Sequence, residues 1–350
     1  MKTRSFKRNT LVLLSLTLTA LIAVSCGGAK KETQIVVATY AGKYQELLNK
    51  YVIPELKKTH PNLKVVYTLG NDGDHNPKLI AEKGGQGSFD VLTMSASSLT
   101  THYENEIIGD LDFAKLPNAA HLLEQFKFNF AVPQIYSAVT LAYNEKEVSP
   151  KPDSWAVFWE PKYKGKVGVF SGGDAYWMLA AVAANGGDIL KDDWLNHWPK
   201  LMELRNQDPK FYASQDALVT ALRSGEVWLS INYRARNALL TAEGSEPLAD
   251  VLPREGSYAT WYGAAIPKNA NNPEGAYAFL NTLLLPEVQK GFGEDFGYSP
   301  SVDNVTLSPE ILGKIGFNTG EQRLVYPIPT PFFQELSTRM NEPWNQEFMR

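Results

Sequence analysis

The 350-residue sequence contains one cysteine, Cys26, and therefore offers no pair for an intramolecular disulfide. Packing alone must stabilise the fold, even in an oxidising compartment. The sequence also has only five histidines, which are scattered along the chain without the i, i+4 spacing of a helical zinc site. We therefore expect no metal site of that kind.

Motifs for nucleotide hydrolysis and serine hydrolysis are also missing. Gly165-Lys166 is followed by Val167 and precedes a predicted strand, whereas a phosphate-binding loop ends in Gly-Lys-Ser/Thr and precedes a helix. No Gly-x-Ser-x-Gly elbow occurs. Because the sequence shows no nucleophile–base pair and no metal set, we predict a protein that is not an enzyme and uses no cofactor.

Basic residues gather at the N-terminus, and no basic run follows them. Removing residues 1–25 removes four basic and no acidic side chains, so the formal net charge moves from −4 to −8. A mildly acidic chain without a basic patch is a poor partner for nucleic acid, and we expect none.

The N-terminus has the order of a secretory signal, with a basic start, an uncharged apolar run at residues 11–24 and small residues before Cys26. The run is shorter than the ~20 residues of a membrane-spanning helix. Ala-Val-Ser-Cys followed by two glycines resembles a bacterial lipobox, although Leu is commoner than Ala at the first position; the alternative is a free thiol. We predict a signal peptide at 1–25, a linker at 26–33 and lipidation of Cys26, which anchors the protein to a membrane in the periplasm or on the outer cell surface.

Strand and helix patterns alternate after this segment. Residues 34–39, 63–69 and 89–94 are predicted strands, and residues 44–58 and 77–83 are predicted helices. This order indicates parallel strands in an α/β layer. The mature length exceeds the size at which a single core usually divides, so we expect two lobes.

The rest of the chain continues in the same way. Residues 134–144 form a long extended segment, residues 166–170 and 227–232 are predicted strands, residues 176–184 a helix and residues 331–349 one amphipathic helix. The polar cluster at 71–76 lacks the further acidic positions of a calcium loop and is predicted to be a solvated loop that turns at Gly73. We expect no bound metal there.

Several phrases occur in an order typical of one family. They are found at residues 36–45, at 89–95 (Phe-Asp-Val-Leu-Thr-Met-Ser), at 141–166 (Leu-Ala-Tyr-Asn, then Pro-x-Ser-Trp and Pro-Lys-Tyr-Lys-Gly-Lys) and at 264–281 (Ala-Ala-Ile-Pro-Lys, then Asn-Pro-Glu-Gly-Ala). With them, the chain resembles the periplasmic spermidine/putrescine-binding proteins of ABC importers, from about residue 35 to the C-terminus.

The resemblance implies an α/β fold of the two-lobed periplasmic-binding-protein type (type II), with discontinuous lobes joined by crossing hinge strands. The first lobe is expected at 34–137 plus 258–300 and the second at 138–257 plus 301–350. It also implies a monomer that captures a small solute between its lobes and delivers it to an ABC permease. The alternative is a sensor or adhesion lipoprotein that uses the same fold.

The resemblance also implies the ligand-binding residues. In that family aromatic rings cover the aliphatic part of a polyamine and carboxylates hold its ammonium groups. By position, these residues are Tyr40 and Tyr44 in the first ligand loop, Ser95, Asp174 in an acidic loop, and Tyr233. Tyr44 has the alternative of packing its helix on the sheet, and Asp174 that of a helix N-cap.

Two departures from the family bear on the ligand. Trp261 and Tyr262 stand where the family places an aspartate, and Arg234 and Arg236 follow a strand where it usually has uncharged residues. Arginine commonly binds a carboxylate or phosphonate through two parallel hydrogen bonds. One hypothesis is therefore a ligand with an anionic group, such as an amino acid or a small organic anion. The alternative is that both arginines point to solvent and the ligand is a true polyamine.

Overall fold

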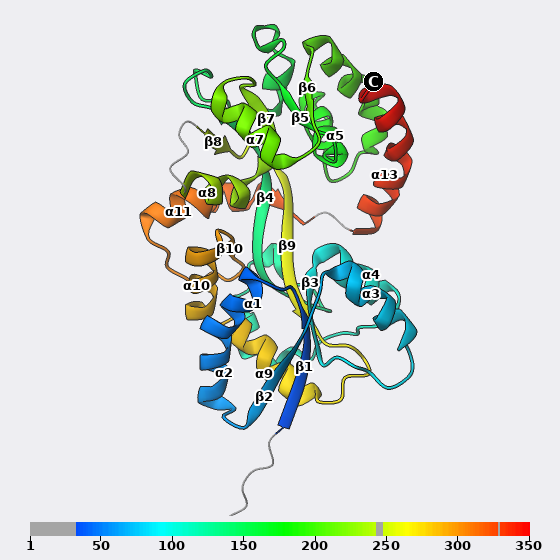
Figure 1. Cartoon of the computed structure of the whole chain (residues 1–350), viewed down its shortest axis with the longest axis vertical. Coiled ribbons are helices and arrows are strands. Elements are labelled where there is room, and N and C mark those ends of the chain that lie inside the picture. Colours follow the sequence, from blue (N-terminus) through cyan, green and yellow to red (C-terminus); the bar gives the residue numbers. More distant parts are fainter. Residues whose placement is uncertain (1–32, 243–247, 328–329) are drawn as a thin grey trace, which may run out of the picture. The chain divides into compact units, whose positions relative to one another are not determined.

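The computed structural model describes residues 33–242, 248–327 and 330–350, so the predicted signal peptide and lipidation at Cys26 lie outside the described residues. Two long antiparallel strands, β4 (Val132–Asn144) and β9 (Ser257–Ala265), run through the centre and link two groups of helices and strands (Figure 1). Every residue of β4 is buried, the polar side chains of Gln134, Ser137 and Asn144 included, and the strand confirms the long extended segment predicted at 134–144.

The first group of strands forms a mixed sheet. Strand β1 (Thr33–Thr39) pairs in parallel with β2 (Leu63–Leu69) and β3 (Val91–Ser95), which confirms the parallel pairing predicted from the alternation of elements. Strand β9 lies between β3 and β4 and is antiparallel to both, and the full order is β10-β4-β9-β3-β1-β2.

Helices cover this sheet on both sides. The predicted helix at 44–58 is present as α1 (Lys43–Leu47), a π-helical turn (Leu48–Val52) and α2 (Ile53–Thr59). The remaining helices of this group are α3 (Asp72–Ala81), α4 (Ala96–Glu104), α9 (Pro273–Leu283) and α10 (Pro286–Phe296).

The predicted solvated loop at 71–76 is wrong, because helix α3 begins at Asp72. Asn71 caps this helix by accepting a hydrogen bond from the Asp74 amide, and the Asp74 carboxylate accepts one from the Asn71 amide in return. This reciprocal capping box satisfies backbone donors at the helix start and makes a helix of residues that otherwise favour turns.

The second group packs around the other half of β4. Strands β7 (Leu229–Tyr233) and β8 (Leu248–Val251) are antiparallel to β4, and β5 (Gly168–Phe170) pairs in parallel with β6 (Lys210–Tyr212). Its helices are α5 (Asp174–Ala184), α6 (Trp198–Glu203), α7 (Gln215–Ser224) and α8 (Arg234–Ala242). Its core is built on the buried side chains of Trp155, Trp177 and Trp194.

The C-terminal part of the chain returns to the second group. Its elements are β10 (Ser299–Pro300), α11 (Pro309–Ile315), α12 (Thr319–Gln322), β11 (Val325–Tyr326), α13 (Thr330–Pro343) and a final π-helical turn (Trp344–Phe348). Val302 and Phe317 pack with the first group, whereas Met340 and Phe348 join the tryptophan core. The exact lobe limits stay a prediction.

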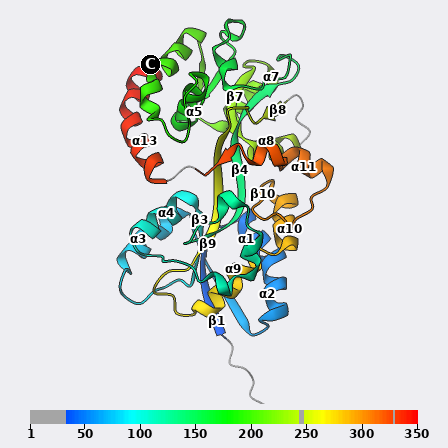
Figure 2. The same cartoon turned by 180° about the vertical axis from the view of Figure 1, so that it is seen from behind.

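Helix α13 lies against α5 and reaches α4 of the first group, an arrangement visible from both sides (Figures 1 and 2). The predicted helix at 331–349 is therefore present, with a change to π-helix at Trp344. No helix in the described part of the chain is long and apolar enough to span a membrane.

Candidate ligand-binding site

A cavity of about 750 Å³ lies where several strands end and helices begin. Ser95 is the last residue of β3, Tyr233 the last residue of β7, and Asp174 the first residue of α5. Carboxyl ends of strands are the usual ligand site in α/β sheets. The cavity is lined by Ser95, Ala96, Ser97, Gly172, Asp174, Ala175, Tyr176, Tyr233, Tyr258, Ala259, Thr260, Trp261, Tyr262, Phe333, Ser337 and Thr338.

The structure brings five of the predicted site residues to this cavity. They are Ser95, Asp174, Tyr233, Trp261 and Tyr262. Their positions come from elements far apart in sequence, which the crossing strands β4 and β9 place side by side.

Three tyrosines form one wall of the cavity. The hydroxyl groups of Tyr176 and Tyr233 contact each other, and their rings meet edge to face with centroids 5.3 Å apart. Tyr258 packs its ring 5.8 Å from that of Tyr176. Burial raises the pKa of all three phenols, so they are neutral at physiological pH. This wall therefore offers neutral hydroxyl groups and aromatic faces.

Asp174 is the one acidic side chain among the described residues that line the cavity. It is not the N-cap of α5; Gly173 occupies that position and Asp174 is the first helical residue. Burial raises the pKa of Asp174, and hydrogen bonds from the backbone amides of Ala175 and Asp174 oppose the rise only in part. The helix N-terminus carries about half a positive charge, which the full charge of the carboxylate exceeds.

Tyr40 and Tyr44 lie behind the cavity wall. The hydroxyl of Tyr40 donates to Asp72 at 2.5 Å, and its ring meets that of Tyr262 edge to face at 5.7 Å. Tyr44 is buried and donates to the amide oxygen of Gln134 at 2.5 Å. The packing alternative considered for Tyr44 therefore matches its position in the structure.

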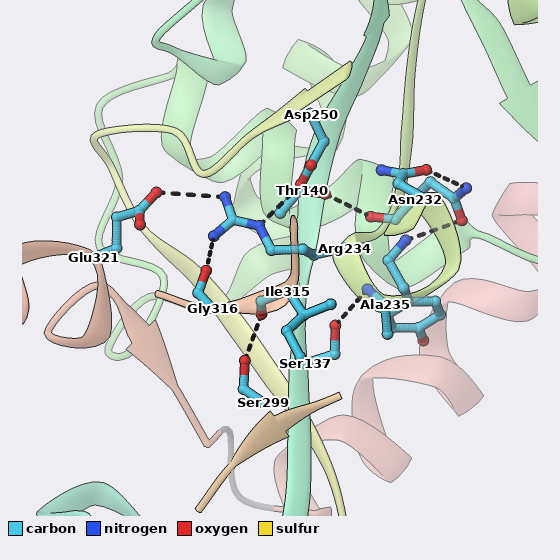
Figure 3. Close-up of polar contacts among 12 residues, drawn as sticks. Ser137, Thr140, Asn232, Arg234, Ala235, Asp250, Ser299, Ile315, Gly316 and Glu321 are labelled. Atoms are coloured by element: carbon cyan, nitrogen blue, oxygen red, sulfur yellow. Dashed lines mark hydrogen bonds and ion pairs between the residues drawn. The ribbon is translucent and has the colours of Figure 1, made fainter. Parts of the chain in front are cut away.

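Arg234 does not line the cavity, and its guanidinium lies in a buried network (Figure 3). Its Nε lies 3.1 Å from Asp250, one terminal nitrogen donates to the Gly316 carbonyl at 2.7 Å, and the other lies 3.4 Å from Glu321. The guanidinium also lies 4.3 Å from the ring centroid of Phe317. Burial by itself lowers the pKa of Arg234, but the charges of Asp250 and Glu321 outweigh this effect and raise it.

Arg236 is likewise paired outside the cavity. Its guanidinium forms an ion pair with Asp216, whose side chain is 76% exposed. Neither arginine lines the cavity, and none of the described residues that do so is Lys, Arg or His. The walls therefore carry a negative charge without a cationic side chain to balance it.

Sequence reasoning missed several residues of the site. Tyr176 follows Asp174 in the first turn of α5, and Tyr258 lies four residues before Tyr262 on β9, on the same face of the strand. Because every second side chain of a strand lies on the same face, Tyr258 could have been predicted from the sequence as a neighbour of Tyr262. Phe333 and Ser337 are also four residues apart on α13, but their sequence gives no indication that this face meets a cavity.

The described residues contain no group of three or more His, Cys, Asp or Glu side chains placed to hold a metal ion. Within the cluster at 71–76, Asn71 and Asp74 are used in capping α3, and Asp72 accepts hydrogen bonds from hydroxyl groups. The carboxylates of Asp72 and Asp74 are therefore occupied by protein partners.

Comparison with known proteins places this geometry in context. Residues 52–315 match the family described as bacterial extracellular solute-binding protein. The chain is 28% identical over 262 residues to the spermidine/putrescine-binding periplasmic protein of Escherichia coli, covering 71% of this chain and 74% of that protein. It is 26% identical over 338 residues to the putrescine-binding periplasmic protein PotF of the same organism, covering 88% and 87%.

A solved structure shows the same fold. The ABC transporter substrate-binding protein of Bradyrhizobium japonicum superposes with a TM-score of 0.74 at 22% identity, over 91% of this chain and 100% of that one. The predicted two-lobed α/β fold of the type II periplasmic binding proteins is thereby confirmed. The similarity to polyamine-binding proteins that the sequence phrases indicated is confirmed as well.

Proposed function

Because the chain belongs to the family of bacterial extracellular solute-binding proteins, we propose that its cavity captures a cationic amine, such as a diamine or polyamine, for an ABC importer. The observation that carries this proposal is the charge of the cavity. Asp174 faces it, and no described lining residue is a cation. A buried charge needs a partner, and an ammonium group would supply one for Asp174, which forms no ion pair within the described residues.

The aromatic residues of the cavity suit the same ligand. Trp261, Tyr233 and Tyr262 line the cavity. Aromatic rings can pack on methylene groups and attract ammonium charge, and cation–π contacts contribute about 0.5–2 kcal/mol each. The neutral hydroxyls of the tyrosine wall can accept hydrogen bonds from ammonium N–H groups. This combination of carboxylate, phenols and rings matches an amine on an aliphatic chain.

The competing hypothesis of an anionic ligand finds no cation among the described residues that line the cavity. Arg234 is held by Asp250 and Glu321, and Arg236 is held by Asp216. Releasing Arg234 would leave two carboxylates without their partner, at a cost of several kcal/mol. A zwitterionic amino acid stays an outcome of the ligand screen described below.

The screen measures the thermal stability of the mature protein with putrescine, spermidine, 4-aminobutyrate, amino acids and small organic acids. A ligand present at ~100 times its Kd adds about 2.7 kcal/mol to the free energy of unfolding, which raises the Tm measurably. We expect shifts with the diamines and polyamines. A shift with acids alone, and none with any amine, would overturn the proposed ligand.

Binding should also depend on pH through Asp174. Burial raises the pKa of Asp174, so this carboxylate takes up its proton at a higher pH than an ordinary aspartate, whose pKa is about 3.9. We therefore expect the affinity for putrescine to begin to fall at a correspondingly higher pH as the solution is acidified. The neighbouring Tyr176 does not titrate in this range, since its pKa is raised from an already high value. Isothermal titration calorimetry between about pH 4 and pH 7 measures the effect.

The stability of the ligand-free protein should depend on pH in the opposite direction from the affinity for putrescine. A carboxyl whose pKa is higher in the folded than in the unfolded state stabilises the ligand-free protein at low pH, and this contribution is lost as pH rises through the folded pKa. The Asp174→Asn variant removes both effects. An affinity that stays constant down to about pH 4 would contradict the role of Asp174.

We further propose that the mature protein is a monomer that a lipid on Cys26 holds at the membrane surface. Its relatives are periplasmic proteins, which supports a location outside the cytoplasm. Cys26→Ser is expected to move the protein from the membrane fraction to the soluble fraction of the producing cell, because the acyl attachment site is lost. A variant that stays in the membrane fraction and keeps its size would contradict lipidation.

A further inference from the structure

Asp72, the first residue of α3, is a carboxylate next to the cavity. It accepts hydrogen bonds from the hydroxyl groups of Tyr40 at 2.5 Å, Ser95 at 2.5 Å and Ser98 at 2.7 Å. The amide of Ser95 lies 3.3 Å from the same carboxylate. Within the described residues, no Lys, Arg or His forms an ion pair with it.

The bond to Asp72 decides what Ser95 presents to the cavity. A hydroxyl group has one proton and two lone pairs, and Ser95, which lines the cavity, gives its proton to Asp72. One lone pair receives the amide of Ser98 at 3.4 Å, as expected for the N-cap of α4. The remaining lone pair can only accept, so this point of the wall suits a donor such as an ammonium group.

The charge of Asp72 acts in the same direction. The N-terminus of α4 reaches the cavity at Ala96 and Ser97 and by itself favours an anion with about half a positive charge. The negative charge of Asp72 lies next to this helix end and offsets its positive charge at short range. The charge also reaches the cavity wall, because Asp72 adds to the effect of burial in raising the pKa of Tyr262.

We propose that Asp72 is a positioning residue that sets the specificity of the site, by turning the Ser95 hydroxyl into an acceptor and by cancelling the positive end of α4. This wall therefore selects ammonium groups and rejects carboxylates. The inference rests on the proposed capture of an amine and adds a second, indirect selector to Asp174. Tyr40 and Ser98 hold the carboxylate in place from its other sides.

The test compares two ligands of similar length, putrescine and 4-aminobutyrate. In 4-aminobutyrate a carboxylate replaces one terminal aminomethyl group of the diamine. Asp72→Asn keeps the size of the side chain but removes its charge, and its amide can donate to the Ser95 oxygen and release the serine proton to the cavity. We expect putrescine affinity to fall at least about tenfold and the preference for putrescine over 4-aminobutyrate to fall by a similar factor.

Glu104→Gln is the matched control, because it removes one negative charge from the exposed last residue of α4. The ligand preference should not change in this variant. The ratio of the calorimetric Kd values for 4-aminobutyrate and putrescine measures the ligand preference. If Asp72 had a purely structural role, this ratio would not change in the variant. If Asp72→Asn does not fold, Ser95→Ala gives the same readout, because it removes the accepting oxygen and must also lower the preference for putrescine.

The outcomes separate this inference from the proposed function. A wild-type protein that binds no amine overturns the proposed function itself. The other outcome is that the wild-type protein binds putrescine and the preference is unchanged in Asp72→Asn, or in Ser95→Ala where that variant replaces it. This result overturns the role of Asp72 and leaves the amine capture intact.

Discussion

Asp174→Asn is expected to weaken putrescine binding by about 30-fold to several thousand-fold. Truncating one member of a buried, hydrogen-bonded charge pair costs about 2–5 kcal/mol, and each 1.4 kcal/mol is a factor of ten in Kd. The loss has two parts. The ammonium group loses its ionic partner inside the cavity, and the half charge at the start of α5 is no longer outweighed by a carboxylate.

The measurement is a calorimetric Kd at neutral pH, with the Tm of each variant as a check of folding. Glu310→Gln serves as the control, because it also neutralises an acid in the first turn of a helix, α11, but at a side chain that is 75% exposed and outside the cavity lining. We expect the control to bind like the wild type. Binding within about threefold of the wild type in Asp174→Asn would show that another group holds the ammonium.

Arg234→Ala is expected to destabilise the protein by about 3–5 kcal/mol, the usual cost of removing one partner from a buried ion pair. Only 7% of Arg234 is exposed, and its loss leaves Asp250 and Glu321 without their cation. It also removes a donor from the Gly316 carbonyl and a cation from the face of Phe317. The network in Figure 3 therefore ties α8 and β8 to the segment around α12.

The second arginine offers a close control. Arg236→Ala removes the same side chain two residues later, where the partner is exposed, and surface pairs contribute at most about 1 kcal/mol. Urea denaturation of the ligand-free proteins gives both free energies of unfolding. Equal stability of the two variants would contradict the buried network. Loss of an acidic ligand with wild-type stability would instead support the sequence hypothesis that Arg234 reads an anion.

The outcome for Arg234 shows why sequence alone could not assign the ligand charge. Its placement directly after a strand was predicted correctly, and that position is compatible with a cleft as well as with a buried network. The decision depends on Asp250 and Glu321, which are 16 and 87 positions further along the chain. Nothing in the local sequence shows that these carboxylates meet the guanidinium.

Local patterns were sufficient where local forces dominate. The buried strands and their parallel pairing followed from apolar runs and from the order of elements. The start of α3 was missed although Asn71 and Asp74 have the spacing of a capping box, because acidic and amide residues next to a glycine also favour turns. The same oversight concealed Asp72, which the structure places beside the cavity wall.

The position of β9 in the sheet also determines when the protein can fold during synthesis. Leu92 on β3 pairs with Ala265 on β9, and β9 separates β3 from β4, so the first sheet has a gap until the chain has been made beyond residue 265. Contacts between such distant segments form slowly because a long loop must close first. The core of the first group of elements can therefore be completed only after most of the chain has been synthesised.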